Sequence, residues 1–419
     1  MRIVYVLTSL GMGGAERQVV VLASRMAGRG HTVALMVLRP LVPEQWPTEL
    51  RVVHLEMRKN PASVLAAIAR GHSFLAEFKP DLVHSHTFHA NIAARLLKVT
   101  LPALPVLCTV HNVYEGGWGR MLAYRLTGGM SRLTTAVSQA AADRFVHLKA
   151  VSRGKCIVVP NGIDTDEFLP SAERRERTRA AMGVEHEFIW LTAGRMVPAK
   201  DYPNLLRAFR RVVEARPDAR LWIAGEASGT KANLVQTLAA ELGLDEQATE
   251  KGGIFNRGGK QGLKPNDEFK AFAARLKSCP VTKHFNDLAK PSVSAASEAV
   301  RWLGLRRDMP ALLDAADGFV LGSAWEGMPL AVGEAMAMEK LVVATDVGGV
   351  RELVGDAGVM APFKDPEALA EAMLDMMRLS PEERHTVGCA ARERILRDFN
   401  MDARTEEWEA LYLKITADL

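Results

Sequence analysis

Short apolar runs alternate with stretches of helical spacing along the first part of the chain. Ile3–Leu7 is followed by a glycine turn and then by a stretch from Glu16 to Met26 whose apolar residues recur at helical intervals. Further helices are predicted at 62–78 and 91–97. Further predicted strands share the same short apolar character and cover 31–38, 52–55, 82–84, 106–110, 133–137 and 156–159. This alternation indicates an α/β domain with a parallel sheet.

The alternation pauses near Pro160–Asp164 and then begins again. A polar helix is predicted around 174–179. The second series of predicted strands and helices covers 188–193, 202–214, 220–224, 234–242, 300–303, 311–315, 318–321, 330–337 and 341–344. We therefore expect an α/β fold of two Rossmann-like, doubly wound domains that face a central cleft. The expected domains are 1–168 and 169–401, and a helix within 402–419 is expected to pack back toward the first domain.

Composition narrows the class of protein. The chain has 419 residues, of which 48% are hydrophobic and 24% are charged, and these fractions exclude a disordered chain, a collagen and a disulfide scaffold. None of the four cysteines forms a C-x-x-C pair, which argues against a zinc knuckle and favours reduced thiols in a cytoplasm. The first apolar run is too short for a signal peptide, and no stretch approaches the roughly 20 apolar residues of a membrane span. We expect a cytoplasmic protein, or one peripheral to the inner face of the cell membrane.

The net charge of +4 is unevenly distributed. Residues 1–170 carry 19 basic and 11 acidic side chains, whereas 171–247 and 300–419 together carry 25 basic and 33 acidic ones. Residues 248–299 carry 9 basic and 5 acidic side chains, so this one segment accounts for the whole excess. A basic first domain would favour contact with an anionic membrane surface. The pattern gives no sign of nucleic-acid binding.

The segment 248–299 interrupts an otherwise regular second domain. Its start is rich in glycine, and an amphipathic helix is predicted at 267–278. Because it joins a helix to a strand, we expect it to lie away from the strand ends that form the cleft. It is either a poorly ordered loop or an extension that binds a partner, and whether it impairs activity is open.

The first turn reads Gly11-x-Gly13-Gly14-x-Glu16. Glycines let the backbone approach a phosphate, and the following helix N-terminus favours an anion. The dinucleotide fingerprint fails because Glu16 replaces its third glycine. The turn is equally compatible with phosphate binding and with a plain strand-to-helix connection.

Histidines cluster at the end of one predicted strand, as His84, His86 and His89. No cluster of carboxylates or thiolates lies near them in the sequence, so we interpret them as cleft-lining or locally satisfied side chains rather than metal ligands. His111 follows the next strand, where a polar side chain is better placed for a substrate than for packing.

Asp164-Thr165-Asp166 matches a D-x-D metal pattern, but it lies in a Pro-Asn-Gly turn. Such Asx-rich turns make local hydrogen bonds. We interpret it as an interdomain turn and expect no metal.

The loop from Gly194 to Asp201 follows the first strand of the second domain. It carries Arg195 and Lys200. Arginine offers a planar fork and lysine a point charge, a combination that suits a diphosphate.

The most specific pattern is Glu326-Gly327-Met328-Pro329-Leu330-Ala331-Val332-Gly333-Glu334. Pro329 is a natural first residue of a helix, so Glu326 precedes the helix and Glu334 lies on its second turn. The helix start lies between the two carboxylates, so both can face one ligand. Gly348-Gly349 is a further glycine turn into a helix.

Together these patterns resemble the retaining glycosyltransferases of family 4, which have the two-Rossmann (B-type) fold. The resemblance rests on five segments in the expected order and covers nearly all of the chain except 248–299. These segments are G-G-A-E at 13–16, T-V-H-N at 109–112, P-N-G-I-D at 160–164, G-R-x-V-P-x-K at 194–200 and E-x7-E at 326–334.

The resemblance implies transfer of a sugar from a nucleoside diphosphate donor to a glycan or lipid-linked acceptor, with retention and without a metal. Arg195 and Lys200 would bind the donor diphosphate, Glu326 the donor sugar and Glu334 the ribose. His111 would lie near the sugar and the acceptor. Further donor contacts are implied for Gly13, Gly14, Gly304, Leu305, Gly327, Met328, Pro329 and Leu330.

Two other functions remain open at this stage. One is a nucleotide-sugar epimerase on the same fold, and the other is a nucleotide-sugar-binding protein with an impaired site. The E-x7-E segment favours the transferase. The sequence gives no physical basis for choosing the donor base, although a uridine donor is our expectation.

Overall fold

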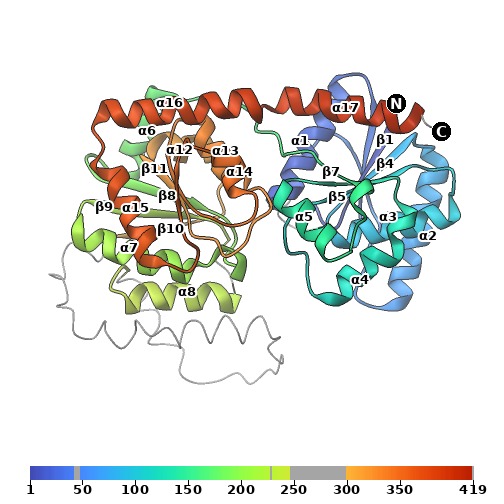
Figure 1. Cartoon of the computed structure of the whole chain (residues 1–419), viewed down its shortest axis with the longest axis horizontal. Helices are drawn as coiled ribbons and strands as arrows, with labels where there is room; N and C mark the ends of the chain where they lie inside the picture. The colour runs from blue at the N-terminus through green and yellow to red at the C-terminus, as the bar shows by residue number, and fades with distance from the viewer. Residues whose placement is uncertain (42–47, 227–228, 246–298, 418–419) are drawn as a thin grey trace.

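The computed structural model describes residues 1–41, 48–226, 229–245 and 299–417. They form two α/β domains, each built on a wholly parallel sheet (Figure 1). The first sheet has the order β3-β2-β1-β4-β5-β6-β7, and the second has the order β10-β9-β8-β11-β12-β13. In both, the chain begins in the middle of the sheet, builds outward to one edge and then crosses to the other side. The expectation of two Rossmann-like domains is therefore confirmed.

The strands are short, and those in the middle of each sheet are almost wholly buried, as expected when helices cover both faces of a parallel sheet, whereas the strands at the sheet edges are partly exposed. In the first domain they are β1 (Arg2–Leu7), β2 (Thr32–Val37), β3 (Arg51–His54), β4 (Leu82–His86), β5 (Val106–Val110), β6 (Leu133–Ala136) and β7 (Cys156–Val158). In the second they are β8 (Phe188–Ala193), β9 (Ala219–Ala224), β10 (Val300–Gly304), β11 (Gly318–Leu321), β12 (Leu341–Thr345) and β13 (Val359–Ala361).

Helices lie between most strands of the first domain, and side-chain caps begin two of these helices. Asn60 accepts a hydrogen bond from the Ser63 amide at the start of α2, and Ser138 accepts one from the Ala141 amide at the start of α5. The helices are α1 (Gly14–Gly28), α2 (Pro61–Phe78), α3 (Phe88–Thr100), α4 (Trp118–Thr127), η1 (Gly128–Met130), α5 (Gln139–His147) and η2 (Arg153–Lys155).

The second domain is built in the same way. Its helices are α6 (Ala172–Met182), η3 (Pro198–Lys200), α7 (Tyr202–Ala215), α8 (Gly229–Glu241), α12 (Met309–Ala315), α13 (Leu330–Ala337), α14 (Val350–Val354), α15 (Pro366–Arg378) and α16 (Pro381–Asp398). The helix predicted at 267–278 and all of the segment 248–299 except Ala299 lie outside the described residues.

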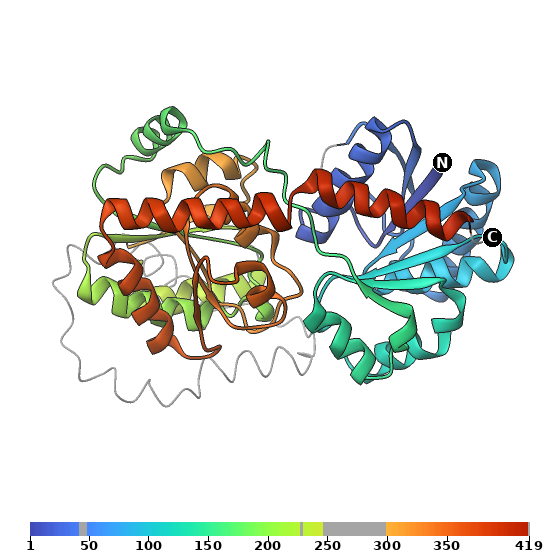
Figure 2. The ribbon, with the colours of Figure 1, turned by 45° about the horizontal axis from the view of Figure 1, so that its top comes forward.

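The last two helices run in line along one side of the molecule (Figures 1 and 2). α16 lies on the second domain, and α17 (Met401–Ala417) crosses to the first, where Trp408 and Tyr412 enter its core. The Tyr412 hydroxyl lies 3.2 Å from that of Tyr5 on β1. The chain thus connects the domains twice, once near residue 160 and once near residue 400. Among the described helices, none combines the length and the apolar character that a bilayer span requires.

The structure differs from the sequence prediction in several details, and α4, α5, α15 and β13 lie in segments for which no element was predicted. β4 extends to His86, so His84 and His86 are strand residues rather than the start of a loop. Pro329 precedes the first residue of α13 instead of being that residue, a shift of one position at a helix end. The charged helix α16 was not predicted, because most of its positions are polar and its apolar spacing is weak. A capping box of Ser380 and Glu383 fixes its start.

Candidate active site

Several of the residues singled out from the sequence lie at the point in each sheet where the strand order reverses. In the first domain, the Gly11–Gly14 turn follows β1, and β4 beside it ends at His86. In the second, the Arg195–Lys200 loop follows β8 and Glu326 follows the adjacent β11. Open parallel sheets bind their ligands at such positions.

Lys200 and Glu326 form the centre of the site. The Lys200 ammonium donates to Glu326 Oε1 over 2.7 Å, and the Ser323 hydroxyl donates to the same oxygen over 2.7 Å. Glu326 is 7% exposed, so this carboxylate is buried and paired. The amide of Ala324 donates to the carbonyl of Ala199, which joins the two loops directly. The pair is held by backbone contacts as well as by charge.

Arg195 lies on the loop that carries Lys200. Its side chain is exposed, and its charge acts on Glu16 in the first domain. Burial raises the pKa of Glu16, and Arg195 opposes that rise. The Glu16 carboxylate lies over the turn, since a Cβ added to Gly13 would lie 2.2 Å from Glu16 Oε2. The glycine turn and Arg195 therefore face each other, with a carboxylate at the position that the sequence suggested for a phosphate.

The loop between Glu326 and α13 presses against the first domain. A Cβ on Gly327 would lie 2.0 Å from the carbonyl oxygen of His111, so only glycine fits there. The Asn161 side chain donates to the Met328 carbonyl over 3.1 Å. Gly14 faces the start of α13. A Cβ added to Gly14 would lie 3.7 Å from the Leu330 side chain. The segments around residues 14, 111, 161 and 327 thus meet at the domain boundary.

Glu334 is paired differently from Glu326. Arg17 of α1 donates to Glu334 and also to Glu167, the latter over 2.6 Å. Burial raises the pKa of Glu334, and the positive charge of Arg17 opposes the rise. The two carboxylates of the E-x7-E segment therefore hold different cations, one from each domain. No spacing in the sequence marks Arg17 as a partner of Glu334.

His111 lies in a buried cluster at the end of β5. Its Nε2 is 2.9 Å from Nδ1 of His86. Burial lowers the pKa of His111 to about 4, and it also lowers that of His86 well below the usual value. Both imidazoles are therefore neutral near pH 7. They can exchange hydrogen bonds with a hydroxyl group but do not act as cations there.

A carboxyl group that was not predicted supports the His111 loop. Glu115 accepts a hydrogen bond from the His111 amide over 3.0 Å and another from the Tyr124 hydroxyl over 2.6 Å. Burial raises the pKa of Glu115 to about 7. No spacing in the sequence marks this residue, because its partners come from a loop and from α4.

The other histidines and the D-x-D segment have structural partners. His84 contacts the hydroxyls of Tyr412 and Thr109, each over 2.7 Å. His89 is an exposed residue of α3, and its ring packs edge-on against Phe88. Asp164 accepts from Arg25 over 2.9 Å in the turn that joins the domains.

Gly304 and Leu305 lie at the end of β10, two strands from β8. Gly304 has a φ of +65°, and its carbonyl accepts from the Gly225 amide over 2.8 Å. This places them at the same edge of the sheet as the Lys200 loop.

Among the described residues, one group of three side chains could share a metal ion, namely Glu339, His385 and Cys389, and none of them belongs to the loops around Lys200 and Glu326.

Family models match three parts of the chain. Residues 12–167 match the model described as Glycosyltransferase Family 4. Residues 174–254 and 278–378 match two models described as Glycosyl transferases group 1. These matches enter the segment 248–299 from both sides and leave residues 255–277 outside all three.

Characterised relatives and solved structures are similar over most of the chain. A UDP-Gal:alpha-D-GlcNAc-diphosphoundecaprenol alpha-1,3-galactosyltransferase of Escherichia coli is 22% identical over 83% of this chain and 79% of its own. An alpha-maltose-1-phosphate synthase of Mycolicibacterium smegmatis is 25% identical over 80% and 79%. The crystal structure of Anabaena Alr3699/HepE in complex with UDP and glucose superposes with a TM-score of 0.73, at 19% identity, over 99% and 100% of the two chains.

Proposed function

Since the chain belongs to the glycosyltransferases of the B-type fold, we propose that it transfers a hexose from a nucleoside diphosphate sugar to a glycan or lipid-linked acceptor, with retention of the anomeric configuration. The proposed setting is synthesis of a cell-surface polysaccharide or lipopolysaccharide. The observation that carries the proposal is the buried Lys200–Glu326 pair at the point where the strand order of the second sheet reverses.

The proposed chemistry needs positive charge at the leaving group. As the bond to the sugar breaks, negative charge grows on the nucleoside diphosphate. Lys200 and Arg195 follow β8 on one loop and would bind this diphosphate. Cations fixed in advance at that position stabilise the transition state more than the ground state.

The remaining residues would position the sugar and the nucleoside. The Glu326 carboxylate would stabilise a donor sugar that becomes oxocarbenium-like, and Ser323 and Lys200 hold it in place. His111, neutral at pH 7, would hydrogen-bond a sugar or acceptor hydroxyl. Glu334 would bind the ribose once Arg17 releases or shares it. Met328 and Pro329 would complete the donor site.

We propose a uridine diphosphate donor and an acceptor that is a lipid-linked diphosphate sugar. The E. coli relative is named for UDP-galactose and for a diphosphoundecaprenol acceptor, and the Anabaena structure contains UDP. Both are similar to this chain over most of its length, which supports the proposal at the level of substrate class.

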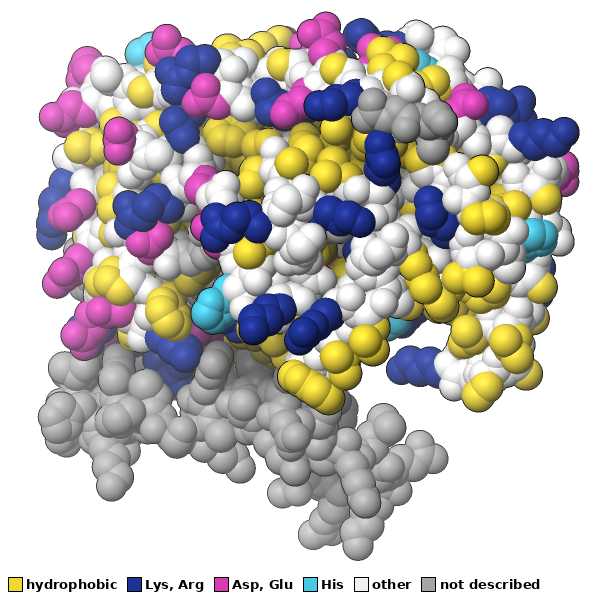
Figure 3. Space-filling view, turned by 45° about the vertical axis from the view of Figure 1, so that its right-hand side comes forward, with side chains coloured by type: hydrophobic (Ala, Val, Ile, Leu, Met, Phe, Trp, Pro, Cys, Tyr) yellow, Lys and Arg dark blue, Asp and Glu magenta, His cyan; other side chains and the backbone are white. Residues whose placement is uncertain are grey.

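Peripheral contact with the inner face of the cell membrane is proposed for the first domain. On α4, Trp118 is 79% exposed and Leu126 is 73% exposed, and Arg120 and Arg125 lie on the same helix. Figure 3 shows basic and hydrophobic side chains intermixed on the face turned to the viewer, whereas acidic ones gather at its left and upper edges. Exposed apolar side chains beside cations suit an anionic lipid surface.

A transfer assay tests the proposed reaction. The protein is incubated with α-linked UDP-, GDP- and ADP-sugars and with lipid-linked acceptors. The anomeric configuration of the product is then read by proton NMR. We expect one nucleotide class to support transfer and the product to be α-linked. A β-linked product would contradict retention, and turnover of the donor sugar to its epimer without an acceptor would favour an epimerase.

The same assay tests whether catalysis needs a divalent metal. We propose that Lys200 and Arg195 supply the charge that a metal would otherwise provide. Adding excess EDTA is therefore expected to leave the initial rate unchanged within about twofold. A rate that falls with EDTA and returns with Mg²⁺ or Mn²⁺ would show that Lys200 and Arg195 do not supply enough positive charge on their own.

A further inference from the structure

A basic cavity lies in the first domain at the end of the sheet opposite to the cleft. Its volume is about 450 Å³. Its walls come from the segments that lead into β6 and β7 and from the ends of α4 and α5, whereas the cleft residues follow the carboxyl ends of strands. The proposed donor site does not extend to this position.

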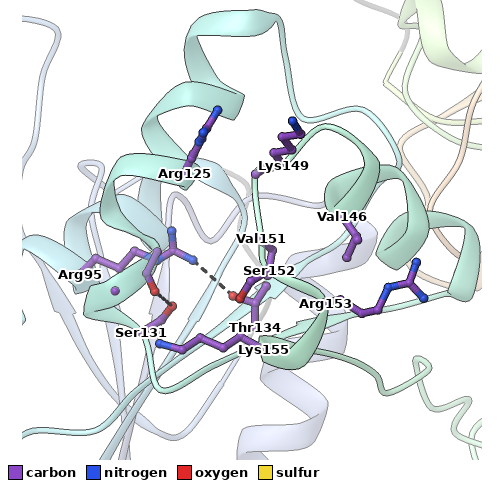
Figure 4. Close-up of a pocket in the computed structure, with 13 residues that line it drawn as sticks. Arg95, Arg125, Ser131, Thr134, Val146, Lys149, Val151, Ser152, Arg153 and Lys155 are labelled. Carbon is purple, nitrogen blue, oxygen red and sulfur yellow. Dashed lines mark hydrogen bonds between the residues drawn. The ribbon is translucent and has the colours of Figure 1, made fainter.

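The cavity is lined by five cations and by no carboxylate. Figure 4 shows Lys155 reaching across the cavity below Ser131, with Arg125 and Lys149 at its upper rim. The lining cations are Arg95, Arg125, Lys149, Arg153 and Lys155.

Arg95 is the deepest of these cations and is fully buried, with 0% of its side chain exposed. Its guanidinium stacks over the Tyr124 ring and donates only to neutral acceptors. Those acceptors are the Cys108 thiol, the Tyr124 carbonyl and the hydroxyls of Thr127 and Thr134. A buried charge is normally paired with an opposite charge, and the hydrogen bonds of Arg95 supply none.

Neighbouring cations repel one another in this region. Burial lowers the pKa of Lys98, and the charges of Arg132 and Lys155 lower it further. A bound anion would relieve this repulsion. Ser152 is exposed beside the cations and offers a hydroxyl donor to such an anion, whereas the buried Ser131 hydroxyl donates to the Gly128 carbonyl.

We propose that this cavity binds a phosphate or diphosphate group. The charge of the buried Arg95 guanidinium acts from beneath the cavity, and Lys155 and Arg125 contact the anion from the rim. Arginine and lysine together suit phosphate, since one offers paired donors and the other a mobile point charge. The group belongs either to a soluble phosphorylated molecule or to a lipid headgroup. This inference does not depend on the transfer reaction.

The test uses the full chain with its cleft cations removed, as Arg195→Ala/Lys200→Ala, so that binding in the cleft does not contribute. Inorganic phosphate and pyrophosphate are titrated calorimetrically at constant ionic strength. In parallel, flotation measures binding to phosphatidylcholine vesicles with and without phosphatidic acid. Adding Arg125→Ala/Lys155→Ala is expected to weaken binding by at least about tenfold. Both side chains are exposed, so the fold is expected to survive.

A matched control removes two exposed cations elsewhere, as Arg177→Ala/Lys414→Ala. It is expected to change binding by less than about twofold. If the cavity variant loses binding to pyrophosphate but still binds the vesicles, the ligand is a soluble phosphate. If it loses binding to the vesicles but still binds pyrophosphate, the ligand is a lipid headgroup. Equal losses in the cavity variant and the control would overturn the proposal, as would a cavity variant that binds both probes as well as its parent does.

Discussion

Replacing Glu326 with glutamine is expected to lower kcat by about 100- to 1,000-fold, the cost typical of removing one electrostatic group that acts in a transition state. Glutamine keeps the shape of the side chain and an oxygen that can accept from Lys200 and Ser323. The negative charge that would stabilise an oxocarbenium-like sugar is lost. The measurement is steady-state transfer with the preferred donor, combined with thermal unfolding to verify the fold.

Glu367→Gln is the matched control for this variant, because Glu367 is an exposed glutamate at the start of α15. It is expected to keep the wild-type rate. A Glu326→Gln protein that is folded and within about threefold of the wild-type rate would remove Glu326 from the mechanism.

Replacing Lys200 with alanine is expected to lower kcat/KM by about 1,000-fold, since it affects both donor binding and departure of the diphosphate. It also leaves the buried Glu326 carboxylate without its cation, a costly arrangement for a charge that is 7% exposed. Kinetics with the preferred donor measure the effect. Combining Lys200→Ala with Glu326→Gln is expected to restore stability but not activity, which separates the two consequences.

Lys200→Arg and Lys414→Ala complete this series. The arginine keeps the charge, and we expect it to recover part of the lost rate. Lys414 is exposed on α17, and its removal is expected to leave kinetics unchanged. Full activity in Lys200→Ala would mean that the cation serves the folded structure rather than the donor.

The fold could be predicted from the sequence because the central strands of both sheets are buried on both faces. Segments such as Ile3–Leu7 and Phe188–Ala193 therefore appear as continuous apolar runs, and the turns between them carry glycine and proline. Elements that depend on tertiary packing could not be predicted from the sequence. α16 is mostly polar, and its position is fixed by packing of a few residues such as Ala391 and Ile395.

The location of the site was also readable, because chemistry-bearing residues followed strands whose carboxyl ends meet. Lys200 and Glu326 were assigned to one site on this basis, and the structure brings them into contact. The partners of Glu334 and His111 were not assigned. Arg17 and Glu334 are 317 positions apart in the chain, and Glu115 reaches His111 through a loop. No local spacing reports such contacts.

The roles of the individual site residues stay predictions, and the structure suggests an order in which to test them. Arg17 is the residue to follow first after Lys200 and Glu326. It binds the carboxylate that would hold the ribose, and it comes from the opposite domain. If Glu334 binds the donor ribose, the state of this ion pair would link donor binding to the contact between the domains.

The central claim is that the cleft binds a nucleoside diphosphate through the loop that carries Lys200. Calorimetric titration of UDP, GDP and ADP into the wild-type protein and into Lys200→Ala tests it most directly. We predict that the wild-type protein binds one of the three with one site per chain, and that Lys200→Ala binds the same nucleotide at least about tenfold more weakly. Equal affinity in the two proteins, or no binding of any of the three nucleotides to the wild-type protein, would contradict the account.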